Sequence, residues 1–166
     1  MNLLRLRRTQ RAAIVLVAAG LLVAGLRRHA TTVHRPAPAL PTRVLQGAPV
    51  TVASLRGHPT ALIFWASWCT ACRVEGAAVE RFARSAAGRG RVVGVDDSDG
   101  GNWKAFVHTY GWSFPILSDP GGTTLSTYGL TVALPATVIL DARGRVASVR
   151  YGAETVAMLR NALAAA

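Results

Sequence analysis

The sequence predicts an α/β fold in which a central mixed β-sheet is flanked by helices, and three observations lead to this prediction. The chain has 166 residues, 51% of them hydrophobic, which is enough for one core of roughly 100–150 residues plus an appendage. Residues 60–65 (TALIFW) form a continuous apolar run, as expected of a strand buried on both faces of a sheet. After this run, helix-like segments alternate with short apolar stretches, which is typical of a sheet covered by helices.

The remaining elements follow in order along the chain. After Cys72 we expect a helix to about Ala87, with Val74, Ala78 and Phe82 on one apolar face at four-residue spacing, ended by a Gly-Arg-Gly turn. Strands or extended pieces are expected at 91–95, 114–117, 136–140 and 146–151, with a hairpin turn at 141–144, and helices at 102–110, 123–128 and 154–165.

The amino terminus has the pattern of a membrane-targeting segment. Residues 12–26 are an uncharged apolar run of 15 residues, preceded by four arginines and followed by two. As a helix this run spans about 22 Å, less than the roughly 30 Å of a bilayer core, which favours a cleaved signal peptide. Small residues at the positions required for cleavage occur only inside the run, which favours an uncleaved anchor. We therefore expect residues 1–28 to be a signal-anchor, with a signal peptide as the alternative.

The flanking arginines also predict the orientation. The positive-inside bias places the amino terminus in the cytoplasm and the domain outside, in a single-pass protein of the cell membrane. If the signal is cleaved instead, the protein is secreted or periplasmic. Residues 29–41 contain three prolines in six residues, which favours an extended tether, so the folded domain is expected to span residues 42–166.

The charge of the chain does not indicate a nucleic-acid partner. The net charge is +11, but six arginines lie in the first 28 residues. The rest of the chain interleaves 13 basic with 8 acidic residues and has no block rich in lysine or arginine. We therefore expect no nucleic acid as a partner.

The strongest functional signal is the pair Cys69 and Cys72 in FWASWCTAC, where a strand runs out and a helix begins. At a helix N-terminus, Cys69 faces unpaired backbone N–H groups and the positive end of the helix dipole, which favour thiolate over thiol. Cys72 lies one turn deeper and can attack a mixed disulfide on Cys69 to release the partner. This predicts a redox-active disulfide, with Cys69 as the attacking sulfur and Cys72 as the resolving one.

Other uses of two cysteines fit less well. A zinc site needs about four Cys or His ligands, and only four scattered histidines accompany the pair. Haem attachment needs a histidine directly after the second cysteine, where this chain has Arg73. A purely structural disulfide gains little from closing so short a loop. We therefore expect no metal and no cofactor.

Glu75 lies three residues after Cys72, hence on the same face of the helix, among apolar or small neighbours. Burial would raise its pKa and let it exchange a proton with Cys72. The alternative is a solvated glutamate paired with Arg73 or Arg81. Of the two nearby tryptophans, we expect one in the core and the other, Trp68, as a partly exposed lid beside the cysteines.

Pro135 precedes an apolar strand. If the Leu134–Pro135 bond is cis, its turn could lie against the cysteine pair and present the Leu134 backbone to an extended peptide. An ordinary trans proline that opens a strand is the alternative. Trp68, Leu134 and Pro135 are thus the predicted substrate-binding residues.

Several motifs in order along the chain resemble the TlpA-like family of thioredoxin-fold proteins, which includes membrane-anchored reductases of cytochrome c maturation. They are LRG at 55–57, FWASWC at 64–69, CRVE at 72–75, GVD at 94–96, FPILSDP at 114–120, YGL at 128–130, LPAT at 134–137 and DARG at 141–144. The resemblance implies a thioredoxin-like fold, with Cys69 as nucleophile, Cys72 as resolving thiol, Glu75 as the acid beside it and Pro135 as a cis-proline.

The chain also departs from the family pattern. Residues 70–71 (Thr-Ala) lack the proline often found between the cysteines, and Gly76 replaces the proline that commonly follows the glutamate. Ala136 stands where haem-maturation reductases often carry Glu or Thr, which weakens that assignment. Ile63 occupies the place of the buried acid of thioredoxin, which leaves Glu75 as the carboxylate for proton transfer. Ala66 replaces the Thr or Ser that a peroxidatic cysteine needs, so peroxidase activity is not expected.

These observations predict an enzyme that reduces protein disulfides outside the cytoplasmic membrane, in cytochrome c maturation or a related process. Its partners would be protein thiols and disulfides and a membrane thiol donor, and we expect a monomer. An oxidase or isomerase running the same exchange is the first alternative. The second is a non-catalytic module that binds extended peptides, which retention of both cysteines and Glu75 disfavours.

Overall fold

The computed structural model describes residues 31–98, 100, 102–130 and 133–166, so the predicted membrane-targeting segment 1–28 lies outside the described residues. The described chain forms one sheet of seven strands in the order β1-β7-β6-β3-β4-β5-β2. The strands are β1 Thr31–Pro36, β2 Val44–Gln46, β3 Thr60–Trp65, β4 Val92–Asp97, β5 Ile116–Asp119, β6 Ala136–Leu140 and β7 Arg145–Tyr151. The helices are α2 Thr70–Arg84, α3 Trp103–Tyr110, α4 Thr123–Thr127 and α5 Val156–Ala164, with a short 3-10 helix, η1 Ala53–Leu55.

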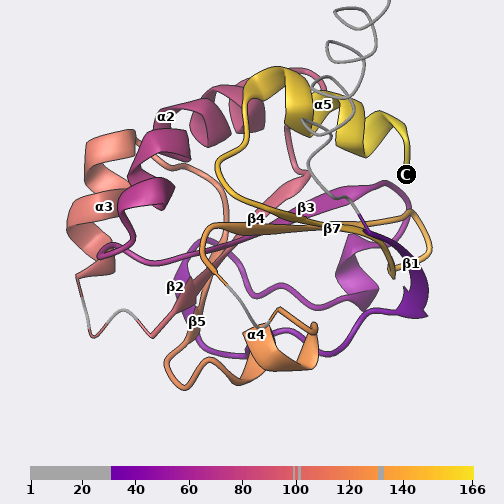
Figure 1. Cartoon of the computed structure of the whole chain (residues 1–166), viewed down its shortest axis with the longest axis horizontal. Helices are drawn as coiled ribbons and strands as arrows, with labels where there is room; N and C mark the ends of the chain where they lie inside the picture. The colour runs from indigo at the N-terminus through magenta and orange to yellow at the C-terminus, as the bar shows by residue number, and fades with distance from the viewer. Residues whose placement is uncertain (1–30, 99, 101, 131–132) are drawn as a thin grey trace, which may run out of the picture.

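The sheet is mixed, as predicted. β3 pairs with β4 and β4 with β5 in parallel, because α2 and α3 carry the chain back across the sheet between them. The pairs β3–β6, β6–β7, β1–β7 and β2–β5 are antiparallel. Helices α2, α3 and α5 lie on one face of the sheet and α4 on the other (Figure 1).

The core has two halves, one on each side of the central strand. Every residue of β3 is buried, and its side chains alternate between the halves. Ala61, Ile63 and Trp65 pack under the helices α2, α3 and α5, whereas Leu62 and Phe64 pack on the opposite side. The continuous apolar run in the sequence is therefore explained by a strand with no solvent-facing side.

The helices and strands predicted from residue 60 onward are confirmed, with ends that differ by a few residues, but the predicted apolar face of α2 is wrong at its start. Val74 is 74% exposed, whereas Phe82 is fully buried. Residues four apart drift by about 40° around a helix, so Val74 and Phe82 lie about 80° apart. The buried stripe instead runs through Cys72, Gly76 and Val79 to Phe82.

The amino-terminal boundary of the domain also differs from the prediction. Strand β1 lies within the expected tether 29–41 and pairs along β7 at one edge of the sheet. Leu40 belongs to the core, and the Tyr128 hydroxyl donates a hydrogen bond to the Pro38 carbonyl at 2.8 Å. Proline is tolerated here because an edge strand and its exit need not donate every N–H. The folded unit thus begins before residue 42. Within the described ranges, no helix has the length and apolar content needed to cross a membrane.

Candidate active site

The cysteine pair lies where β3 ends and α2 begins. Cys69 is the N-cap residue of α2, and its Sγ accepts a hydrogen bond from the Cys72 N–H at 3.1 Å. The Cys69 carbonyl accepts from the Arg73 N–H at 3.3 Å, which starts the helical ladder. A sulfur thus occupies the place where a serine or aspartate oxygen ordinarily caps a helix. The cap stabilises negative charge on Cys69 whenever its bond to Cys72 is broken.

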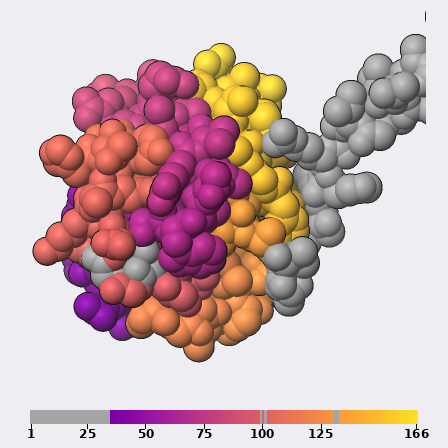
Figure 2. Space-filling model, turned by 60° about the vertical axis from the view of Figure 1, so that its left-hand side comes forward, coloured from indigo at the N-terminus to yellow at the C-terminus, as the bar shows by residue number. Residues whose placement is uncertain are grey.

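Cys69 and Cys72 are joined in a disulfide, with Cα atoms 5.3 Å apart. Cys69 retains 7% of its surface exposed and Cys72 none. The start of α2 reaches the surface between α3 and the carboxyl-terminal segment (Figure 2). A partner thiol or disulfide can therefore approach Cys69, whereas Cys72 is reached only from within the protein.

Glu75 is buried on the same face of α2 as Cys72, with 1% of its surface exposed. Its Oε2 accepts a hydrogen bond from the Glu154 backbone N–H at 2.8 Å. Burial raises the pKa of Glu75 to about 8, the Glu154 N–H opposes the rise, and the Glu154 charge adds to it. The alternative pairing with Arg73 does not form, because Arg73 instead donates to the Ser67 carbonyl at 2.9 and 3.1 Å. Glu75 is therefore a protonated carboxyl group at neutral pH.

The Leu134–Pro135 peptide bond is cis. Ala136, which follows it, pairs with Phe64 of β3, so the proline lies at the same end of the sheet as the cysteines. Leu134 is half-buried and packs against the core half that contains both cysteines. Trp68 is 59% exposed. The predicted exposure of Trp68 and the cis isomer of the Leu134–Pro135 bond are thus present, and the substrate-binding role of these three residues stays a prediction.

A hollow of about 360 Å³ lies beside this end of α2. Ser67 and Arg73 form one wall, and side chains of α3 form the other. In the part of the chain that the structure describes, His, Cys, Asp and Glu side chains form no group of three or more that could hold a metal ion.

Sequence reasoning missed one acidic residue of the site. Glu154 is 3% exposed, and its carboxylate accepts from Arg150 Nε at 2.7 Å. Its N–H binds Glu75 across a sequence separation of 79 residues. No local sequence motif predicts this contact, because it depends on how α5 packs against α2.

The sequence profile of the AhpC/TSA family matches residues 33–149. The chain belongs to the AhpC/TSA family. Within this family it is similar to the thioredoxin-like protein YneN of Bacillus subtilis (strain 168), at 32% identity over 123 residues, covering 72% of this chain and 71% of YneN. It is 28% identical over 133 residues to the thiol-disulfide oxidoreductase ResA of Bacillus anthracis, covering 79% and 76% of the two chains.

Among solved structures, the chain is similar to a secreted Mycobacterium tuberculosis disulfide oxidoreductase homologous to Escherichia coli DsbE. The TM-score is 0.64 and the identity 31%, covering 76% of this chain and 96% of the other. The thioredoxin-like fold and the resemblance to TlpA-like members of the AhpC/TSA family are thereby confirmed.

Proposed function

We propose that this protein is an extracytoplasmic thiol-disulfide oxidoreductase that reduces disulfides of other proteins through Cys69 and Cys72. The observation that carries the proposal is the arrangement of three groups at the start of α2: the sulfur of Cys69 at the helix cap, the fully buried sulfur of Cys72 one turn deeper, and the buried carboxyl group of Glu75 on the same face. The similarity to the thiol-disulfide oxidoreductase ResA and to the secreted mycobacterial disulfide oxidoreductase supports the same reaction, thiol-disulfide exchange.

In the first half-reaction the enzyme is reduced. A donor thiolate attacks Cys69 Sγ, the Cys69–Cys72 bond breaks, and Cys72 leaves as a thiolate. Glu75 gives its proton to Cys72, so no unpaired thiolate stays buried. A second donor thiolate then attacks the donor sulfur of the mixed disulfide and releases Cys69 as a thiolate, while the donor becomes a disulfide.

In the second half-reaction the substrate is reduced. The Cys69 thiolate attacks a substrate disulfide, and one substrate sulfur leaves and takes a proton from water. Glu75 then removes the proton from Cys72, whose thiolate attacks Cys69 Sγ and reforms the internal disulfide. The second substrate sulfur leaves and is protonated, and Glu75 has its proton back. Two electrons have passed from the donor dithiol to the substrate.

The cellular setting is part of the proposal. We place residues 1–28 in the membrane as a signal-anchor, with the domain as a monomer on the extracytoplasmic side and a membrane thiol donor as its reductant. The arginine-flanked apolar run and the resemblance to membrane-anchored reductases of cytochrome c maturation support this placement. The direction of electron flow follows from the reduction potential, since a dithiol near about −270 mV acts as a reductant and one near about −120 mV as an oxidant.

The test of the function is a trapping experiment. Cys72→Ala leaves Cys69 able to attack but removes the resolving thiol, so mixed disulfides with substrate proteins should accumulate and be visible on non-reducing gels. Cys69→Ala is the matched control and should trap none. The proposal fails if Cys72→Ala captures nothing and the wild-type protein neither reduces nor oxidises a protein disulfide.

A further inference from the structure

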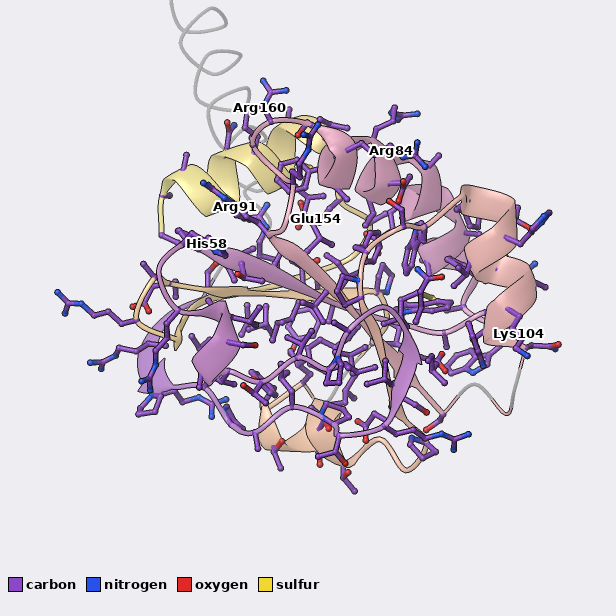
Figure 3. The ribbon with its side chains drawn as sticks, turned by 180° about the vertical axis from the view of Figure 1, so that it is seen from behind. His58, Arg84, Arg91, Lys104, Glu154 and Arg160 are labelled. Carbon is purple, nitrogen blue, oxygen red and sulfur yellow. A yellow bond between two sulfur atoms is a disulfide. The ribbon has the colours of Figure 1, made fainter. Side chains whose placement is uncertain are left out.

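A second buried acid lies beside the proton-handling carboxyl group. Glu154 precedes α5, which begins at Val156, and lies between the helical layer and the sheet (Figure 3). Its carboxylate accepts from Arg150 Nε at 2.7 Å and from Arg150 Nη2 at 3.5 Å. The Glu154 side chain is 1% exposed and that of Arg150 is 20% exposed. Glu154 and Arg150 thus form a largely buried ion pair, and removal of either partner alone would leave an uncompensated charge in the interior.

Glu154 touches Glu75 in two ways. Its backbone N–H fixes Glu75 Oε2 at 2.8 Å, and its negative charge raises the pKa of Glu75. Among the described residues, Glu75 Oε1 has no hydrogen-bond partner, which leaves this oxygen available to carry the transferable proton.

Other charged groups on the elements packed around Glu75 are engaged elsewhere. On α2, Cys72 is held in the disulfide, and Glu80 binds Arg84 and Ser113. Helix α3 places Tyr110 against Gly76. The β3 side chains under α2 are apolar, and the first turn of α5 carries no acid.

We propose that Glu154, paired with Arg150, is a positioning residue for the proton of Glu75: its N–H orients the carboxyl group, and its charge strengthens Glu75 as the base for Cys72. The inference deepens the proposed function and rests on it for the catalytic consequence. After Glu75 has given its proton to Cys72, two residues in contact with each other both carry a buried carboxylate. Their repulsion favours return of a proton to Glu75, which is the step that generates the Cys72 thiolate for resolution.

The experiment separates the charge of Glu154 from its backbone contact. Glu154→Gln removes the charge and keeps the N–H. In the oxidised full-length protein, where neither cysteine titrates, the carboxyl ¹³C resonance of Glu75 is followed against pH by NMR and assigned by its loss in Glu75→Gln. The wild-type inflection is expected near pH 8, and Glu154→Gln should lower it by about one pH unit.

Three variants control the measurement. Glu154→Asp keeps the charge and should return the inflection close to the wild-type position. Glu80→Gln removes another buried glutamate that is paired with an arginine four residues away. Because Glu80 contacts Ser113 and not Glu75, this variant should leave the inflection unchanged. The double variant Arg150→Gln, Glu154→Gln leaves no unpaired arginine, and the inflection should still be lowered. It serves in place of Glu154→Gln if the single variant does not fold.

A kinetic measurement tests the consequence. A mixed disulfide of Cys69 with glutathione is prepared, and release of glutathione by Cys72 is timed at neutral pH. Release should slow several-fold in Glu154→Gln. An inflection in Glu154→Gln that coincides with the wild-type one overturns the inference, and so does an unchanged release rate. Failure of the wild-type protein to release glutathione would instead overturn the proposed function, because the NMR titration does not depend on catalysis.

Discussion

At the scale of single residues, the buried carboxyl group of Glu75 costs stability whenever it ionises. Burial raises its pKa from 4.5 to about 8 in the folded protein. Between these two values the folded state binds more protons than the unfolded state, so the free energy of unfolding falls as pH rises. The loss is of the order of a few kcal/mol once pH exceeds the folded-state pKa. The buried carboxyl group therefore keeps a proton beside Cys72 at neutral pH and lowers the stability of the protein at alkaline pH.

We therefore predict that Glu75→Gln makes the oxidised protein more stable than wild type at alkaline pH. The amide cannot ionise, so the advantage should grow as pH is raised from about 5 to about 9. Urea unfolding of the oxidised proteins at several pH values measures it. Glu80→Gln serves as the matched control and should not show the growing advantage. Parallel stability curves for wild type and Glu75→Gln would contradict the prediction.

The sequence alone is sufficient to predict the site residues that lie on one helix. Cys69, Cys72 and Glu75 were predicted together because their spacing places them on adjacent turns at a helix start. The isomer of the Leu134–Pro135 bond came from a family resemblance, since the residues alone allow both forms. Glu154 was missed because its contact with Glu75 exists only once α5 has packed on α2.

At the scale of elements, Gly76 of α2 is a point of close contact with α3 and the segment after it. A Cβ atom at position 76 would lie 2.6 Å from Cγ of the Tyr110 ring. Trp112 Nε1 donates to the Gly76 carbonyl at 2.8 Å. The glycine at position 76 is thus explained by the close packing of an aromatic ring, one turn after Cys72.

Gly76→Ala should destabilise the protein by about 1–3 kcal/mol, because overpacking against Tyr110 outweighs the gain in helix propensity of about 1 kcal/mol. Adding Tyr110→Ala should recover part of the loss, as a double-mutant cycle would show. Gly121→Ala is the control, since its added methyl meets only Thr123 Cγ2 at 3.7 Å. Chemical denaturation measures all five proteins: wild type, Gly76→Ala, Tyr110→Ala, the double variant and Gly121→Ala. A Gly76→Ala variant as stable as wild type would refute this account of the interface.

Element prediction succeeded from residue 60 onward and missed the two strands before it, β1 and β2. The six residues of β3 form a continuous apolar run, and the fifteen residues of α2 are long enough for a helical pattern to be recognised. Strand β2 has three half-buried residues and an irregular register against β5, so it offers no pattern to detect. The apolar face of α2 was misplaced at Val74 because a strict four-residue spacing does not follow 3.6 residues per turn.

At the scale of the whole molecule, acidic and basic side chains are distributed unequally between interior and surface. Among the described acidic residues, only Asp141 is not buried. The buried ones are Glu75, Glu80, Asp96, Asp97, Asp119 and Glu154. Exposed basic residues are Arg43, Arg56, Arg73, Arg81, Arg84, Arg89, Lys104, Arg143 and Arg160. The exposed charged side chains of the described residues are therefore basic.

The amino-terminal segment pairs with one edge of the sheet and also packs into the core half on the face away from α2, α3 and α5. Beyond the pairing of β1 with β7, Arg35 Nη2 donates to the Tyr128 carbonyl at 2.6 Å, and Leu40 packs among buried apolar residues. The prolines of this segment predict a tether. Prolines exclude helix and interior strand, but they allow an edge strand followed by an extended exit, and sequence alone does not distinguish these from a free spacer.

We predict that this segment contributes to the stability of the fold. Leu40→Ala in the full chain should cost about 2–5 kcal/mol, the range for a large side chain truncated in a core. A fragment of residues 42–166 should melt well below a fragment of residues 31–166, because β7 loses its partner strand and Tyr128 loses two hydrogen bonds. Ala39→Ser, at an exposed neighbour, is the control and should melt as wild type does. If residues 29–41 were only a tether, Leu40→Ala and the shorter fragment would both melt at the temperature of their references in thermal unfolding followed by circular dichroism.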